Sequence, residues 1–470
     1  MKVIQIPFCF YPDPVGGTEV YVDALSRYLQ EQGVNVAIAA SGNESQSYFH
    51  HQLLVLRFAV SHEVANLREL YGEGDKLAAS EFSKILDEEK PDVVHLHALT
   101  SGASLRLVRA AKQRQIPVVF TYHTPTVSCQ RGTLMRGGTQ VCDGKLDLHT
   151  CARCTLQGLG LNQSGANAIG SLPPLVGRSL GTMNLSGGVW TALRMTELMS
   201  YRHAAFDALM TEVDRVVAVS SWVKDVLVRN QVPSDKITVI RQGLCHAQSA
   251  ALTPPTAPLC QSPLTEGGWR KDGGEEVSET ALKIAFLGRL DPTKGVDILI
   301  KALQFDPQLP VQFDIYGVSQ GGAGDAYQQE LQNLAQNDSR IRFKYPVPAN
   351  EVVKILADYD LLAVPSQWLE TGPLVVLEAF AAGIPVIGSN LGGIAERVEH
   401  EVNGLLVEPN SVEGWYRELQ RLCQDKDLPL RLRAGIHAPQ RMEEVAETMK
   451  KLYRVLLQEK AAGQIANVLE

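Results

Sequence analysis

The sequence predicts an α/β protein made of two Rossmann-like domains, each with a doubly wound parallel sheet. Short Val- and Ile-rich runs alternate with amphipathic helical stretches, which is typical of buried parallel strands and their crossover helices. This alternation occurs in two series that are separated by a stretch rich in Pro, Gly, Ser and Thr. The length of 470 residues suits two such domains, because single α/β domains commonly reach about 200–250 residues.

Composition excludes several classes of protein. The chain is 45% hydrophobic and 20% charged, which is ordinary for a globular protein and excludes fibrous or wholly disordered ones. With 44 basic and 52 acidic residues its net charge is −8, so we expect no nucleic-acid partner. No apolar run approaches the ~20 residues of a membrane helix, and the opening apolar stretch is too short for a signal peptide. The expected location is therefore the cytoplasm.

The first domain is expected over residues 1–244. Helical stretches at 19–33, 76–90 and 104–115 alternate with the apolar runs KVIQIPF, VNVAIAA, PDVVHLHAL and PVVFTYH. A further piece of the same kind over residues 203–230, with a helix N-cap expected at Ser220 and Ser221, precedes the run DKITVI. An insertion of about residues 129–199 interrupts this series. Its part from 158 to 199 is expected to pack on the domain, and the alternatives are a flexible lid and an amphipathic face at the inner membrane surface.

The pattern stops over residues 245–281, which we interpret as an interdomain linker. It restarts over residues 282–440 with the runs LKIAFLG, VQFDIYG, IRFKYPV, DLLAVPS, IPVIGSN and NGLLVEP, which predict a second domain. Residues 441–470 are expected to form a helix that packs back on the first domain. The carboxyl ends of both sheets would face a common cleft, where ligands of such sheets bind.

Two glutamates bracket a predicted helix start in the second domain. Glu370 precedes Pro373, which favours a helix that starts near Thr371 or Gly372, and Glu378 falls in its second turn. Exposed backbone N–H groups at a helix start bind phosphate oxygens, and carboxylates bind sugar hydroxyls. The alternative is a plain helix with one solvated and one loop glutamate.

A basic loop lies beside this predicted site. The segment Gly288-Arg289-Leu-Asp-Pro-Thr-Lys294-Gly295 leaves the first strand of the second domain, and its two cations could neutralise a diphosphate. Gly392 to Glu396 gives a further glycine turn into a helix after the strand IPVIGSN. The alternative for the basic loop is a solvated surface loop.

Together these motifs resemble the GT-B glycosyltransferases, specifically the retaining family 4. The resemblance rests on the two glutamates separated by seven residues, the Gly-Arg…Lys-Gly loop and the Gly-Gly-Ile-x-Glu turn, and it covers nearly the whole chain. The segment Pro14-Val-Gly-Gly-Thr-Glu19 resembles the family's glycine loop, and Phe120-Thr-Tyr-His123 its strand-end histidine. One departure is Arg241-Gln-Gly-Leu-Cys245, where family members usually carry Asn-Gly-Val/Ile-Asp.

The resemblance implies a hexosyltransferase that moves a sugar from a nucleotide-diphosphate donor to a hydroxyl of a sugar, a lipid-linked or a small-molecule acceptor, with no catalytic cofactor or metal. The implied catalytic residues are His123, Arg289, Lys294 and Glu370. The implied donor-binding residues are Gly16, Gly17, Gly288, Arg289, Lys294, Glu370, Thr371, Gly372, Pro373, Leu374 and Glu378. Two alternatives stay open: a catalytically silent nucleotide-sugar-binding scaffold, and a nucleotide-sugar epimerase of the same architecture.

Four of the eight cysteines cluster in the insertion. Cys129, Cys142, Cys151 and Cys154 include a Cys-x2-Cys pair, a spacing common among metal ligands because both thiolates reach adjacent corners of a tetrahedron. The cluster predicts a structural zinc site, with an iron–sulfur cluster as the less favoured metal and free thiols as the alternative. His149 is a possible substitute for one thiolate.

Overall fold

The computed structural model describes the chain except residues 14–15, 62–66, 184–186, 246–280, 320–322 and 470. The chain forms two compact units. The first unit comprises residues 1–245, 368–372 and 440–470, and the second comprises residues 246–367 and 373–439. The predicted linker lies almost wholly outside the described residues. Within the described part of the chain, no helix is both long and apolar enough to cross a membrane.

The first unit contains an eight-stranded sheet in the order β10-β9-β6-β5-β1-β2-β4-β3. All neighbouring strands are parallel except β3 and β4, which form an antiparallel pair that the sequence analysis missed. The bounds are β1 Lys2–Ile6, β2 Asn35–Gly42, β3 Gln46–His50, β4 Leu53–Ala59, β5 Val93–Leu96, β6 Val118–Tyr122, β9 Arg215–Ala218 and β10 Ile237–Val239.

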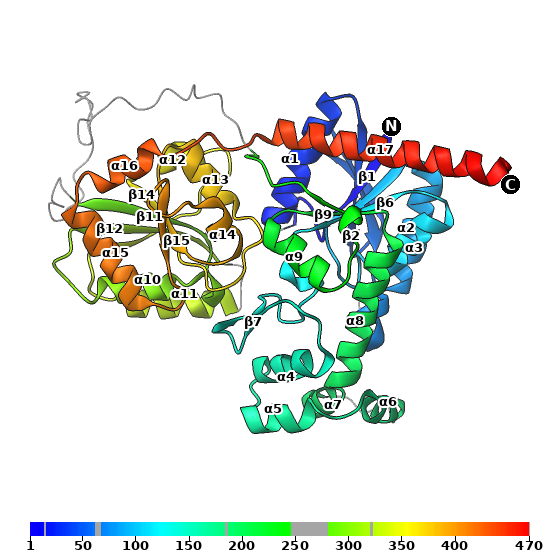
Figure 1. Ribbon diagram of the computed structural model, residues 1–470, viewed down its shortest axis with the longest axis horizontal. Coiled ribbons are helices and arrows are strands. Elements are labelled where there is room, and N and C mark those ends of the chain that lie inside the picture. Colours follow the sequence, from blue (N-terminus) through cyan, green and yellow to red (C-terminus); the bar gives the residue numbers. More distant parts are fainter. Residues whose placement is uncertain (14–15, 62–66, 184–186, 246–280, 320–322, 470) are drawn as a thin grey trace. The chain divides into compact units, whose positions relative to one another are not determined.

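The two faces of this sheet differ in chemistry. Side chains alternate between faces along a strand, so Val94 and Leu96 of β5 point into the hydrophobic core while His95 lies on the opposite face. The core face is covered by α2 Lys76–Glu89, α3 Leu105–Gln113, α8 Met195–Glu212 and α9 Ser221–Arg229. The other face is covered by α1 Gly17–Glu31 and α17 Met442–Leu469, which pack against each other (Figure 1).

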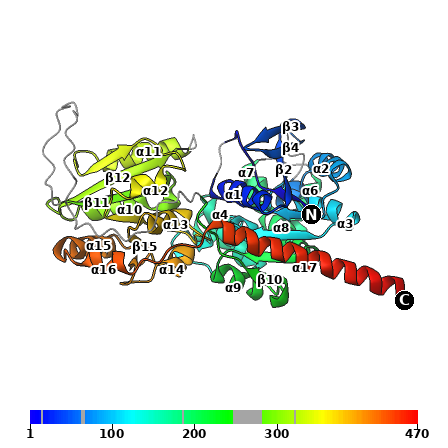
Figure 2. The same cartoon turned by 90° about the horizontal axis from the view of Figure 1, so that it is seen from above.

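The carboxyl-terminal helix belongs to the first unit, as Figure 2 shows for the long red helix beside α1. The chain returns there through a pairing of Leu244 with Arg441, and the N–H of Leu244 donates to the carbonyl of Gln440 at 2.8 Å. Met449 and Tyr453 of α17 are fully buried. Burial of this apolar stripe attaches the helix to the unit that contains the amino terminus.

The insertion forms a small helical subdomain. It contains the hairpin β7 Met135–Arg136 and β8 Gln140–Val141, followed by α4 Leu148–Gly158, α5 Gln163–Ile169, α6 Pro174–Thr182 and α7 Gly188–Leu193. These helices gather around the first half of α8 (Figure 1), where Ala152, Leu156, Met195 and Met199 form a core of their own. Short turns lie at Glu69–Glu73, Pro125–Val127, Ser234–Lys236 and Pro292–Lys294.

The second unit is a six-stranded parallel sheet in the order β13-β12-β11-β14-β15-β16. Its strands are β11 Leu282–Arg289, β12 Val311–Val318, β13 Ile341–Lys344, β14 Leu361–Val364, β15 Val386–Ser389 and β16 Gly404–Val407. One face packs on α10 Val296–Leu303, α11 Ala323–Leu334, α15 Val412–Gln424 and α16 Leu428–Ala434. The other packs on α12 Val352–Leu356, α13 Leu374–Ala381 and α14 Gly392–Arg397, which makes the sheet doubly wound.

Candidate active site

The basic loop of the second unit is a tight, internally bonded turn at the carboxyl end of β11. Arg289 is the last residue of the strand and is exposed, and Lys294 ends the short turn that follows. The Asp291 carboxylate accepts a hydrogen bond from the N–H of Thr293 at 2.9 Å, which fixes the turn between the two cations. The loop therefore presents two positive charges from a defined backbone.

Gly295, which follows Lys294, occupies a position that requires a glycine. Its φ is 67°, and a Cβ at this position would lie 2.1 Å from the carbonyl oxygen of Pro365. A side chain would both strain the backbone and collide with the segment after β14. The glycine thus holds the basic loop against the end of the neighbouring strand.

Gln367 is a site residue that the sequence analysis missed. Its amide nitrogen donates to the carbonyl of Pro365 at 2.6 Å and to the hydroxyl of Ser389 at 3.3 Å, and its amide oxygen accepts from the N–H of Asn410 at 2.6 Å. The buried side chain thus ties together the ends of β14, β15 and β16. Only the order of the strands in the sheet places these groups together.

Glu378 lies in α13 of the second unit, and burial raises the pKa of its carboxyl to about 7. The helix begins at Leu374, with Pro373 as its N-cap, so the predicted start at Thr371 or Gly372 was wrong. Pro373 has no N–H and an extended ψ of 109°, which moves the first helical residue past it. The Gly392 turn opens α14 as expected.

Glu370 and Thr371 belong by their contacts to the first unit. A carboxylate oxygen of Glu370 accepts from the indole N–H of Trp368 at 2.9 Å, and its backbone carbonyl accepts from the indole N–H of Trp222 at 3.1 Å. The Thr371 hydroxyl donates to the backbone carbonyl of His123. Both residues are buried. The structure thus places Glu370 beside the strand that carries His123.

His123 terminates a chain of buried hydrogen bonds on the polar face of the first sheet. Its Nε2 lies 2.9 Å from Nδ1 of His97, and Nε2 of His97 lies 2.6 Å from Oε1 of Gln5. The Gln5 amide nitrogen donates to the hydroxyl of Tyr453 at 3.2 Å, and that hydroxyl lies 2.6 Å from Nδ1 of His95. The chain continues from His95 Nε2 to the hydroxyl of Thr121 at 2.7 Å.

These histidines are neutral. Burial lowers the pKa of His123 to about 3 and holds the pKa values of His95 and His97 well below 6.5. The sequence analysis identified only His123. The signal for the others was present, because Gln5 is a polar residue inside a buried strand and His95 and His97 are two residues apart, which places them on one face. Their meeting also depends on the register that sets Gln5 opposite His95.

The glycine loop of the first unit leads into α1. Gly17 is the first helical residue, and the N–H of Gly16 donates to the carboxylate of Glu19 at 2.9 Å. Glu19 is buried, so its carboxylate holds the loop in place at the start of the helix. The preceding two residues lie outside the described part of the chain.

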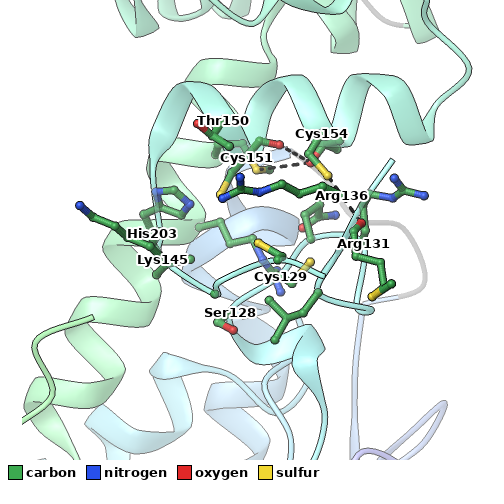
Figure 3. A pocket seen from close by; sticks show the side chains of 18 residues that line it. Ser128, Cys129, Arg131, Arg136, Lys145, Thr150, Cys151, Cys154 and His203 are labelled. Atoms are coloured by element: carbon green, nitrogen blue, oxygen red, sulfur yellow. Dashed lines mark hydrogen bonds between the residues drawn. The ribbon is translucent and has the colours of Figure 1, made fainter. Parts of the chain in front are cut away.

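The four clustered cysteines line one pocket in the insertion. Cys151 and Cys154 lie on α4 at one side of this pocket and Cys129 lies at the other (Figure 3). Cys142, at the end of the hairpin, lines it too, and none of the four forms a disulfide. Burial raises the pKa of the Cys151 thiol to about 12, and the three other thiols add to this rise.

Among the described residues, no three His, Cys, Asp or Glu side chains are arranged to hold a metal ion. The ring nitrogen Nδ1 of His149 lies 2.9 Å from the carbonyl of Gly170. The zinc site therefore stays a prediction, with the iron–sulfur cluster as its alternative. What the structure adds is that residues separated by up to 25 positions line the same pocket.

Comparison with known proteins assigns both parts of the chain to glycosyltransferase families. Residues 15–140 match the family described as Glycosyltransferase Family 4, and residues 269–441 match Glycosyl transferases group 1. The two parts of the chain are thus similar to these two families of glycosyltransferases. Curated relatives include D-inositol 3-phosphate glycosyltransferases from Corynebacterium glutamicum and Rhodococcus jostii.

These relatives match the chain only in part. The Corynebacterium protein is 36% identical over 155 residues, which cover 32% of this chain and 37% of the relative. The Rhodococcus protein is 32% identical over 244 residues, which cover 50% of each chain. The chain thus spans half or less of the length of these relatives.

Solved structures support the GT-B fold over the whole chain. Sucrose-phosphate synthase from Thermosynechococcus elongatus matches with a TM-score of 0.64 and 19% identity, covering 97% of this chain and 99% of that one. Anabaena HepE, solved in complex with UDP and glucose, matches with a TM-score of 0.59 and 17% identity, covering 96% and 99%. At these identities the likeness shows the fold of this chain alone.

Proposed function

We propose that this protein is a retaining glycosyltransferase that transfers a hexose from a nucleoside-diphosphate donor to a hydroxyl acceptor. The observation that carries the proposal is the basic loop of the second unit, with Arg289 and Lys294 held at the carboxyl end of β11. This is the edge of a parallel sheet where ligands bind. In a member of this family, the natural ligand of two such cations is the donor diphosphate.

The positive charge of the basic loop suits the nucleoside diphosphate that leaves during transfer. When the bond between sugar and phosphate breaks, negative charge grows on the diphosphate, and fixed cations stabilise it most where it develops. Arg289 offers a planar fork to two phosphate oxygens, and Lys294 acts as a point charge. With this stabilisation supplied by the chain, we propose that transfer needs no divalent metal and no covalent nucleophile.

We assign the binding of the ribose and of the transferred sugar to two carboxylates. Glu378 of α13 binds the ribose hydroxyls, because an ionised carboxylate accepts from two neighbouring hydroxyls at once. Glu370 binds hydroxyls of the transferred sugar, and the indole of Trp368 orients its carboxylate. His123 contacts a hydroxyl of the reacting sugars. Gly16 and Gly17 let the backbone of the first unit approach the donor.

UDP-glucose is the first donor to test, because HepE was solved with UDP-glucose and with UDP and glucose. The starch synthase IV structure, bound to ADP, makes an ADP-sugar the second. For the acceptor we propose a hydroxyl on a polysaccharide precursor, a glycolipid or a small molecule. The names of the curated relatives put inositol 3-phosphate among the small molecules to test.

Thermal unfolding against UDP, GDP, ADP and their sugar conjugates tests the donor site, because a ligand of the native state raises apparent stability. We expect stabilisation by one nucleotide family, and its loss in Lys294→Ala. Lys301→Ala is the matched control, since Lys301 is an exposed lysine on α10 paired with Asp297. No stabilisation by any nucleotide would contradict the proposal.

Activity with the preferred donor then tests transfer itself. We expect Glu370→Ala and Lys294→Ala to abolish transfer while the proteins stay folded, and the wild-type rate to be the same with and without added Mg²⁺ or Mn²⁺. NMR of the product's anomeric signal distinguishes retention from inversion. Wild-type turnover in either variant would exclude the assigned roles.

A further inference from the structure

One ring nitrogen of His123 has no hydrogen-bond partner. This atom, Nδ1, is buried, and no partner for it lies in the part of the chain that the structure describes. A buried polar atom without a partner costs free energy, so each one calls for an explanation, and a bound ligand is one such explanation. The ring cannot turn freely to avoid this, because Nε2 is bonded to His97 and the ring of Tyr21 stands edge-on to it at 4.8 Å between centroids.

The hydrogen-bond chain determines whether this atom gives or accepts a proton. The amide oxygen of Gln5 can only accept, so His97 must carry its proton on Nε2. A neutral His97 then offers a lone pair on Nδ1, and His123 must donate to it from Nε2. A neutral His123 has only one N–H, so its Nδ1 is a lone pair.

The other half of the chain has the same polarity. The Gln5 amide nitrogen can only donate, so the Tyr453 hydroxyl accepts from it and donates to Nδ1 of His95. His95 in turn donates from Nε2 to the Thr121 hydroxyl. Every group thus uses its donors and acceptors consistently. Turning the Gln5 amide by 180° would reverse every proton along the chain, so this one side chain sets the tautomer of all three histidines.

We propose that Gln5 and His97 are positioning residues that fix His123 as a hydrogen-bond acceptor, so that Nδ1 binds a donor hydroxyl of a substrate sugar. This inference rests on the proposed function and deepens it. A lone pair recognises a group with an O–H, and it disfavours the phosphate oxygens of the donor, which only accept. The site at His123 is thereby specific for a sugar hydroxyl.

His123 can accept a hydrogen bond only while its ring is neutral. Burial lowers the pKa of His123 to about 3, so the lone pair persists throughout the neutral range. A charged His123 would carry N–H on both nitrogens and could not accept from a hydroxyl. Burial alone keeps a histidine neutral but does not select one of its two tautomers. The hydrogen bonds to Gln5 and His97 make that selection for His123.

Nitrogen NMR on the full-length protein with ¹⁵N-labelled histidine rings reads the tautomer directly. The His123 signals are assigned by their absence in His123→Asn. We expect Nδ1 of His123 to give the signal of an unprotonated ring nitrogen and Nε2 that of a protonated one. A protonated Nδ1 in the wild-type protein would overturn the proposal, because it would show the reversed chain.

Two variants separate positioning from folding. Gln5→Met removes the amide oxygen and the amide nitrogen at similar side-chain volume, so we expect mixed tautomers at His123. We also expect kcat/KM for sugar transfer to fall roughly tenfold, which is the loss expected for one hydrogen bond. Its affinity for the nucleoside diphosphate should be unchanged, because that ligand binds the second unit. Gln312→Met is the matched control, because Gln312 is a buried glutamine near the amino end of β12 in the second unit, and it should keep both the His123 signals and kcat/KM within about twofold of wild type.

The outcomes distinguish this inference from the proposed function. An unchanged His123 tautomer together with an unchanged kcat/KM in Gln5→Met would overturn the positioning role. A wild-type protein that shows the expected tautomer but transfers no sugar would refute the proposed function, while the assignment of Nδ1 as an acceptor would stand. Equal losses of nucleotide affinity and kcat/KM in Gln5→Met would show a merely structural role.

Discussion

At the scale of single residues, the candidate site depends on side chains whose charge or conformation is set by burial. Burial keeps the histidines neutral, and it raises the pKa of Glu378 to about 7. The two effects have one cause, because burial disfavours the charged form of either group. A base is thereby kept unprotonated, and an acid is brought to the pH range in which it can change its charge.

Glu378 gives the first prediction. If only its carboxylate form binds the ribose, donor affinity follows the ionised fraction, which falls as the pH drops below about 7. We expect the Kd of a nucleotide sugar to weaken about tenfold between pH 8 and pH 6. Calorimetric titration of the nucleotide sugar measures this, and Glu378→Gln should bind weakly at both values. A wild-type Kd that is the same at both would exclude Glu378 from ribose binding.

Gly295 gives a second prediction at this scale. Gly295→Ala adds a Cβ at a φ of 67° and 2.1 Å from the Pro365 carbonyl, so both strain and collision destabilise the second unit. Gly383→Ala is the matched control, because its φ is 72° with nothing within 4 Å of the added Cβ. We expect about 1 kcal/mol loss in the control, from strain alone, and at least ~2 kcal/mol in Gly295→Ala. Denaturant unfolding measures both, and equal losses would contradict the collision.

At the scale of elements, most parallel strands were predictable, but β4 and the small elements were not. Val93 and Val94 or Val118 and Val119 belong to short apolar runs that alternate with helical stretches, which is typical of parallel strands buried on both faces. The strand β3 was missed because QSYFH alternates weakly and lies at the sheet edge, with Phe49 exposed. The strand β4 was missed although its run LLVLRFA is apolar and pairs with β2 in parallel. The short helices α4, α6 and α7 pack on α8, and α5 packs on α4, so they lack the alternation of strands and helices from which the rest of the fold was predicted.

The site was predictable to a different degree. Arg289, Lys294, Glu370, Glu378 and His123 stand in local motifs, so the order of residues along the sequence is enough to propose them as candidates. Gln367 and the Gln5 chain depend on strand register, and Tyr453 comes from a helix more than 350 residues after His95. A contact across such a separation has no local signal, so it appears only when the sheet and the returning helix are both in place.

The cysteine-rich segment gives a prediction at the scale of elements. The four thiols line one pocket, and we expect the purified protein to contain about one zinc ion per chain by elemental analysis, as a four-thiolate site would. Because burial raises the pKa of Cys151, zinc must displace protons on binding, so metal uptake should release acid. Cys151→Ser should lose the metal, and Cys423→Ser, a cysteine on α15, should keep it.

This metal prediction also bears on the site, since the segment supports Glu370. Leu369 packs with Leu134 and Val226 in a small cluster that Cys129 and Cys142 adjoin. If zinc organises the cysteines, its removal should loosen this packing and reduce transfer together with stability. Full activity in a metal-free protein with four titratable thiols would contradict the prediction.

Helix α17 allows a further prediction about an element. Met449 is fully buried against the first unit, whereas Val455 on the same helix is 44% exposed. Met449→Ala should cost ~2–5 kcal/mol from lost burial and the cavity left behind, and Val455→Ala should stay within about 0.5 kcal/mol. Chemical denaturation of both variants measures the difference. Similar values would show that the helix does not contribute to the stability of the first unit.

At the scale of the whole molecule, the two units have separate hydrophobic cores. The first unit has a large core on one face of its sheet and a smaller one in the insertion, and the second packs its sheet between two. The chain crosses between the units more than once, because residues 368–372 and the carboxyl-terminal helix belong to the first. Each unit therefore has its own cooperative core, and a ligand of one unit acts first on the stability of that unit.

Scanning calorimetry of the full chain tests this division. We expect two overlapping transitions, assigned by variants that each weaken one unit: Met449→Ala lowers the first and Gly295→Ala the second. A nucleoside diphosphate at 100 times its Kd adds about 2.7 kcal/mol to whatever unit binds it. It should therefore raise the transition that Gly295→Ala lowers, and Lys294→Ala should remove this rise. A rise confined to the transition that Met449→Ala lowers would place the nucleotide on the first unit and refute the role of the basic loop.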